Sequence, residues 1–341
     1  VMRLLTILSA AWLIKRTGSS DLDKLAGSGS RMPLASLLFG FGLFSVMGLS
    51  PFKGSFSKFL ILYGAMEQGQ WAIAAVATLA TILASIYYII VIQRVCLEPD
   101  NNAPTEAMPL MKLLTPRWIL LLLLTALTIW LSLMPEPLLH LAEHYASSSI
   151  KTPVPNFETP WHYWVILPYV GGFVLYGLGK INATLRDRAA VIIALLTLYL
   201  VWQHNHSDSL SHLFSVLFAG LITVAVVYSQ AYMRDDEHAN RYYFFLFLMA
   251  GSLIGVTSAP DFGNFYLFWV LMTWSSYFLV VHERTPQALK AGRKYFLLCC
   301  TGAYSMHFAI LVCHTRFGRF DMSVLVLQAT LPSRGFAAVI G

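Results

Sequence analysis

One proline and two lysines interrupt the apolar stretch Gly48-Leu49-Ser50-Pro51-Phe52-Lys53-Gly54-Ser55-Phe56-Ser57-Lys58-Phe59-Leu60-Ile61-Leu62. Proline removes a backbone donor and clashes with the preceding helical turn, so Ser50-Pro51 predicts a helix break near residues 50–54. An ionisable side chain is costly in hydrocarbon, which makes Lys58 a functional candidate. Broken helices with charge beside them are typical of ion pathways in transporters.

The composition around this stretch excludes a soluble globular protein. Of the 341 residues, 57% are hydrophobic and 12% charged, against roughly 25% charged in a soluble domain, and the mean hydropathy is +0.63. Uninterrupted apolar runs fit helices rather than alternating strands, so we expect an all-α, polytopic transmembrane protein. We expect a partial helix at 1–14 and spans near 34–49, 71–93, 117–134, 161–179, 189–204, 211–233, 242–258, 261–282 and 295–315.

The distribution of Lys and Arg predicts the topology. Lys and Arg total 23 against 17 Asp and Glu, a net charge of +6. Connections rich and poor in these residues alternate, so we expect the rich ones on the cytoplasmic side, as in a bacterial inner membrane. The parity of crossings then excludes 54–66 as a separate span. The rich segments are 15–33, 94–117, 180–188, 234–241 and 283–294; segment 316–334 breaks the alternation.

The connection 135–160 marks a boundary. It contains five prolines, a serine run and one basic residue, Lys151, which is typical of an extracytoplasmic linker. We therefore expect two membrane units, residues 1–134 and 161–341. The chain begins with Val1 and ends in a short apolar run, so we expect both units to be parts of a longer protein.

Lys58 has a functional and a structural interpretation. A desolvated lysine can exchange its proton near neutral pH, which is what a proton relay requires. The alternative is a lysine whose ammonium snorkels to the membrane interface.

Two further ionisable residues lie inside apolar runs, at Arg3 and His307. Arg3 is a second charge for a translocation path or an anchor at a helix end. His307 titrates near physiological pH and is a relay candidate; alternatively, it hydrogen-bonds a neighbouring helix.

The sequence offers no cofactor or metal motif. The four cysteines lack C-x-x-C spacing, and there is no phosphate loop, haem histidine pair or G-x-S-x-G. We expect no cofactor, no metal, no redox chemistry within this chain and no nucleic-acid partner. Asp261 opens an apolar run and is interpreted as an N-cap.

Four stretches of the first unit together resemble the motifs of a known family. They are Arg3-Leu4-Leu5-Thr6-Ile7-Leu8-Ser9-Ala10, Asp21-Leu22-Asp23-Lys24-Leu25-Ala26-Gly27, Met32-Pro33-Leu34 and residues 48–58. Their order and spacing are similar to the C-terminal half of the antiporter-like subunits of respiratory complex I, Mrp-type sodium/proton antiporters and membrane-bound nickel-iron hydrogenases such as formate hydrogenlyase. The family pattern is K-A-L-L-F-L, D-l-x-K-l-G-G, M-P-L and G-l-P-P-F-x-G-F-x-S-K. The resemblance implies that Lys58 is the lysine of a proton half-channel. It also implies that Arg3 replaces a family lysine, although arginine hardly deprotonates.

The second unit resembles the N-terminal half of another subunit of this family. The matching stretches are Asp208-Ser209-Leu210-Ser211-His212-Leu213-Phe214, Tyr228-Ser229-Gln230-Ala231-Tyr232 and residues 261–272. They follow the patterns D-x-L-S-x-L-F, Y-S-x-x-Y and D-l-l-x-f-y-l-x-W-E-l-m. The family's functional glutamate falls on Val270, which cannot ionise, and we expect this half's central lysine beyond Gly341.

The resemblance implies proton translocation by a subunit of a redox-driven complex, either complex I-like or hydrogenase-type, in which partner subunits transfer the electrons. One rival is an Mrp-type cation/proton antiporter subunit. In the other, the second unit is a non-conducting scaffold. The expected partners are other membrane subunits, the lipid bilayer, and protons or Na⁺.

Overall fold

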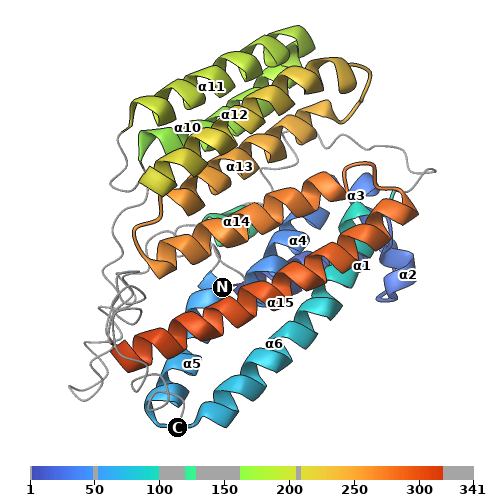
Figure 1. The fold of residues 1–341 in the computed structure, drawn as a ribbon. Coiled ribbons are helices and arrows are strands. Elements are labelled where there is room, and N and C mark those ends of the chain that lie inside the picture. The colour runs from blue at the N-terminus through green and yellow to red at the C-terminus, as the bar shows by residue number, and fades with distance from the viewer. Residues whose placement is uncertain (1, 49–52, 100–119, 128–161, 205–208, 318–341) are drawn as a thin grey trace. The chain divides into compact units, whose positions relative to one another are not determined.

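The computed structural model describes residues 2–48, 53–99, 120–127, 162–204 and 209–317 (Figure 1). Over these residues the chain is helical and has no β-strand. Five helices are long and apolar enough to cross a membrane, and up to six if a bent pair at 22–31 and 33–47, with an angle of 118°, counts as one span. The prediction of an all-α polytopic membrane protein is therefore confirmed.

The first compact unit draws its described residues from 1–154 and 280–305. Helix α1 packs on α4, and α4 also contacts α3, α5 and α6. The close approach of α1 and α4 depends on Gly42, because a Cβ there would lie 2.6 Å from the Thr6 hydroxyl. The helices are α1 (Met2–Thr17), α2 (Leu22–Leu25), α3 (Ser28–Arg31), α4 (Pro33–Met47), α5 (Lys53–Glu67) and α6 (Trp71–Ile92), which continues as a π-helical turn, η1 (Gln93–Leu97).

The second unit draws its described residues from 155–279 and 306–341. Helix α10 packs on α11 and α13, and α12 packs on the same two helices, so the four form a bundle (Figure 1). The buried core of this bundle centres on Tyr243, Phe247 and Val226. The helices are α10 (Tyr163–Ile181), α11 (Ala183–Gln203), α12 (Ser209–Tyr232), α13 (Ala239–Thr257) and α14 (Phe262–Val280).

Helix α15 (Pro286–Phe317) contributes residues to both units. It begins nine residues before the predicted span at 295–315, so much of the predicted connection 283–294 is helical. Thr285 explains the early start, because its hydroxyl accepts from the backbone N–H of Ala288 at 3.1 Å. Pro286 then occupies the first helical position, where its missing N–H costs nothing.

Segment 180–188 is also not the loop that its charges suggested. Only Asn182 separates α10 from α11, and its side chain accepts from the N–H of Thr184 at 2.8 Å. This cap lets α11 begin directly after α10. The predicted linker 135–160 and most of the span 117–134 lie outside the described residues.

Candidate functional site

The predicted helix break lies between α4 and α5. Helix α4 ends at Met47, and α5 begins at Lys53. Gly48 closes α4 with φ = +80°, a left-handed conformation that glycine adopts without steric cost. The last carbonyls of a helix lack intrahelical donors and carry its partial negative charge. The end of α4 is therefore a site for a cation.

Lys58 of α5 occupies this position. Its Nζ donates to the carbonyl oxygen of Met47 at 2.5 Å, and the side chain is partly buried. The ammonium thus lies against the negative end of α4 and is held by a neutral carbonyl rather than a carboxylate. This contact joins the two sides of the break.

Gly48 also leaves space for the lysine. A Cβ at this position would lie 2.8 Å from Cδ and 2.9 Å from both Cε and Nζ of Lys58. Since atoms at the end of a flexible side chain can move, a larger residue would displace the ammonium rather than break the fold. The glycine is therefore required by the lysine as well as by the backbone.

A tyrosine hydroxyl shares the same carbonyl. Tyr304 of α15 is buried and donates through Oη to the Met47 oxygen at 2.9 Å. Ser85 Oγ of α6 lies 3.2 Å from Oη of Tyr304. Sequence analysis missed both residues, because Tyr304 lies 257 residues from Met47 and 219 residues from Ser85 in the chain, so their contacts leave no local signal.

The other two predicted site residues lie elsewhere. Arg3 is exposed in the first turn of α1, in the unit that contains Lys58. His307 belongs to the second unit, where its ring centroid lies 5.0 Å from that of Tyr266. The translocation roles of Lys58, Arg3 and His307 stay predictions.

In the second unit, the resemblance points to Asp261, which directly precedes α14, and to Val270 within α14. Asp261 accepts from the backbone N–H of Asn264 at 2.8 Å and from its side-chain amide at 2.6 Å, which confirms the predicted N-cap. Val270 is completely buried in α14. An apolar side chain therefore fills the position at which the resemblance places a glutamate.

A buried charge network also lies in this unit. Arg186 is 5% exposed and donates to the Asp187 carboxylate at 2.7 Å and to the Asn240 oxygen at 2.6 Å. Its guanidinium carbon lies 4.9 Å from the Tyr243 ring centroid. The guanidinium and the carboxylate thus pair with each other directly, and the bond to Asn240 links α11 to α13.

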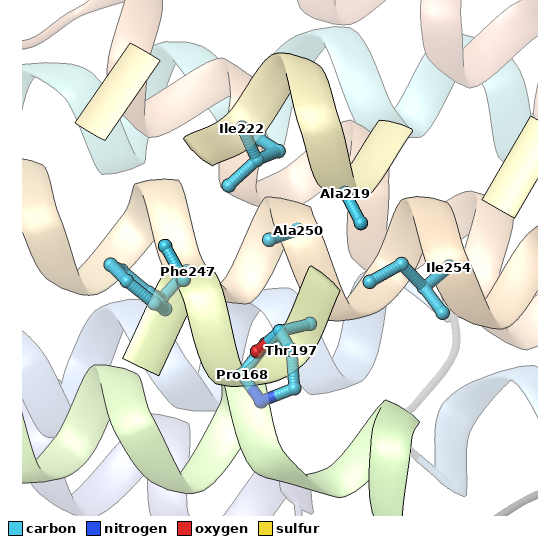
Figure 2. Close-up of a pocket in the computed structure, with 8 residues that line it drawn as sticks. Pro168, Thr197, Ala219, Ile222, Phe247, Ala250 and Ile254 are labelled. Carbon is cyan, nitrogen blue, oxygen red and sulfur yellow. The ribbon is translucent and has the colours of Figure 1, made fainter. Parts of the chain in front are cut away.

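A small cavity lies inside the four-helix bundle, as Figure 2 shows. It has room for about one water molecule. Among the described residues that line it, Thr197 alone has a polar side chain, and its hydroxyl donates to the Ile193 carbonyl at 2.8 Å. Within the described ranges, no group of three His, Cys, Asp or Glu residues could hold a metal ion.

Comparison with known proteins matches the segments that contain Met47, Lys58 and Tyr304. A family model described as NADH:quinone oxidoreductase/Mrp antiporter, transmembrane, matches residues 1–84 and 259–339. The Na(+)/H(+) antiporter subunit A1 of Staphylococcus aureus strain bovine RF122 / ET3-1 is 25% identical over 175 residues, which cover 49% of this chain and 21% of the relative. The same protein of strains JH9 and Newman gives the same values. The match spans about a fifth of the length of these curated relatives.

We expect Gly48→Ala to move the Lys58 ammonium away from the Met47 carbonyl and to slow proton movement through the assembled protein. Dye-detected acidification of membrane vesicles measures this. Gly69→Ala is the matched control, because Gly69 has φ = +72° but a Cβ there would meet no described atom within 4 Å. Equal transport losses in both variants would mean that backbone strain, and not the lysine, explains the effect.

Proposed function

We propose that this chain, which belongs over residues 1–84 and 259–339 to the antiporter-like membrane subunit family, moves protons across a membrane through Lys58. The contact between Lys58 Nζ and the Met47 carbonyl carries this proposal. It places a group that can gain and lose a proton at the interrupted end of a membrane helix.

The chemistry of this contact suits reversible protonation. The Met47 carbonyl and the helix dipole of α4 stabilise the ammonium while it is charged. A neutral acceptor stabilises it less than a carboxylate would, and partial burial disfavours the charge. These opposing effects leave the proton exchangeable, which a proton carrier requires.

The driving force is a second part of the proposal. The relatives named above are Na⁺/H⁺ antiporter subunits, which favours exchange of protons for a cation. The resemblance of the motifs equally allows a complex I-like or hydrogenase-type complex in which partner subunits transfer electrons. In both cases the chain acts beside other membrane subunits, and we place it in a bacterial inner membrane.

The second unit supports a different role. Val270 is completely buried where the family motif has glutamate. We propose that residues 161–341 act mainly as a membrane scaffold that docks neighbouring subunits and supports, through Tyr304, the translocation site carried by residues 1–134.

We expect Lys58→Ala to reduce proton translocation by roughly a hundredfold, the lower end of what a positioned proton-transfer group contributes. Lys58→Arg should also impair it, because a guanidinium hardly deprotonates. Inverted vesicles with a pH-sensitive dye measure transport, driven once by a Na⁺ gradient and once by an electron donor. The drive that supports transport in the wild type identifies the type of complex.

The control for these variants is Lys180→Ala, which removes an exposed lysine of α10 that lies over the Tyr176 ring. It should transport protons like the wild type. Wild-type rates in both Lys58 variants, with normal assembly, would reject the proposed function.

We expect Val270→Glu to weaken assembly without increasing proton transport, because it buries a carboxylate at an apolar position. Val270→Gln is the control for side-chain size. Subunit content on native gels and vesicle transport measure the two effects. Increased transport with Glu but not with Gln would contradict the scaffold role and indicate a second channel that lacks only its acid.

A further inference from the structure

We propose that Tyr304 is a positioning residue for Lys58 and acts through the carbonyl of Met47. The inference rests on the proposed function of Lys58 as a proton carrier. It assigns to Tyr304 and Ser85 the control of how tightly Lys58 holds its proton.

The packing of α15 fixes the tyrosine. Phe296, Cys300, Ala303 and Tyr304 are each at most 4% exposed and share one helical face. The Tyr304 hydroxyl therefore reaches the end of α4 from a rigid element. A second hydrogen bond, from Gln93 Nε2 to the Leu289 carbonyl at 3.0 Å, ties an earlier turn of α15 to η1.

The site thereby combines the two segments that match the family. Lys58 and Met47 lie in residues 1–84, whereas Tyr304 lies in residues 259–339. All three belong to the first compact unit. The lysine site of the first segment is thus completed by a residue of the second.

The hydroxyls of Tyr304 and Ser85 can share a hydrogen bond in two ways. Ser85 Oγ lies 2.9 Å from the Thr81 carbonyl and 3.2 Å from Tyr304 Oη. Each hydroxyl has one proton and at least two acceptors within reach. Two arrangements keep a hydrogen bond between them: in the first, Tyr304 donates to Met47 and Ser85 donates to Tyr304; in the second, Ser85 donates to Thr81 and Tyr304 donates to Ser85.

The two arrangements affect Lys58 differently. In the first, the Met47 oxygen accepts from both Tyr304 and Lys58, and the hydroxyl proton weakens its attraction for the ammonium. In the second, the whole carbonyl is available to Lys58. Tyr304 therefore favours proton release from Lys58 when it turns toward Met47, and Ser85 limits this by offering the competing acceptor.

Other titratable groups lie on the elements of the first unit, but not on α4 itself. On α5, Tyr63 donates to the exposed Glu67 at 2.6 Å, two turns beyond Lys58. On the remaining elements of the unit, the titratable groups are Arg3, Lys15 and Arg16 of α1, Asp23, Lys24 and Arg31 of α2 and α3, Lys53 of α5, Tyr87, Tyr88, Arg94 and Cys96 of α6 and η1, and Lys290, Arg293, Lys294, Tyr295, Cys299 and Cys300 of α15.

The test is the pH dependence of proton transport by the assembled complex in vesicles. Tyr304→Phe removes the competing donor, so Lys58 holds its proton more tightly and the half-maximal pH should move to alkaline values by roughly half to one unit. Ser85→Ala removes an acceptor that competes with Met47 for the Tyr304 proton, so the half-maximal pH should move in the acidic direction. Tyr87→Phe, which removes the hydroxyl of an exposed tyrosine on α6, should leave it unchanged.

Opposite shifts in the two variants would support the proposal, because a purely structural defect lowers the rate without such a pattern. Unchanged half-maximal pH in both, or shifts in one direction, would overturn it. If Tyr304→Phe fails to assemble, Ser85→Ala alone tests the proposal: an acidic shift of its half-maximal pH supports it, and the absence of a shift overturns it. Lys58→Ala in the same experiment separates the two proposals. If Lys58→Ala transports protons at the wild-type rate, the proposed function itself is rejected. If Lys58→Ala loses transport but the half-maximal pH is unchanged in Tyr304→Phe and Ser85→Ala, only the role of Tyr304 is rejected.

Discussion

The hydrogen bond between the Lys58 ammonium and the last carbonyl of α4 is the interaction on which the account of this protein depends. Lys58 lies in an apolar stretch of sequence and is partly buried, and a charged group in apolar surroundings needs a polar partner. An interrupted helix supplies it, because its last carbonyls have no donors of their own. The end of α4 at Met47 and the lysine on α5 therefore act together.

The surrounding helices hold Lys58 and the end of α4 in place. Gly42 allows α4 to approach α1, and Gly48 provides both the left-handed turn and the space for the lysine. Helix α15 adds Tyr304 to the same carbonyl from the opposite end of the chain. In the second unit the buried Arg186 has a carboxylate beside it, whereas Lys58 has a carbonyl. A paired charge suits a structural role, and a charge on a neutral acceptor suits proton exchange.

Sequence analysis predicted the features that have local causes. Ser50-Pro51 predicted the break, the apolar runs predicted the helices, and Asp261 predicted the N-cap, since each signal lies within a few residues of its effect. It misplaced the start of α15 and the turn at Asn182 because it weighed charge above capping. It missed Tyr304 and Ser85, since their roles depend on packing between helices distant in the chain. The division into two family units joined by residues 135–160 stays a prediction.

The most direct test of the central claim is the distance between the Lys58 side-chain nitrogen and the Met47 carbonyl carbon in the membrane. Solid-state NMR dipolar coupling between ¹⁵Nζ-lysine and ¹³C-carbonyl-methionine in the assembled protein measures it, and Lys58→Arg identifies the signal. We predict a separation below about 4 Å, as a hydrogen bond to this carbonyl requires. A lysine signal from position 58 with no such coupling would contradict the account.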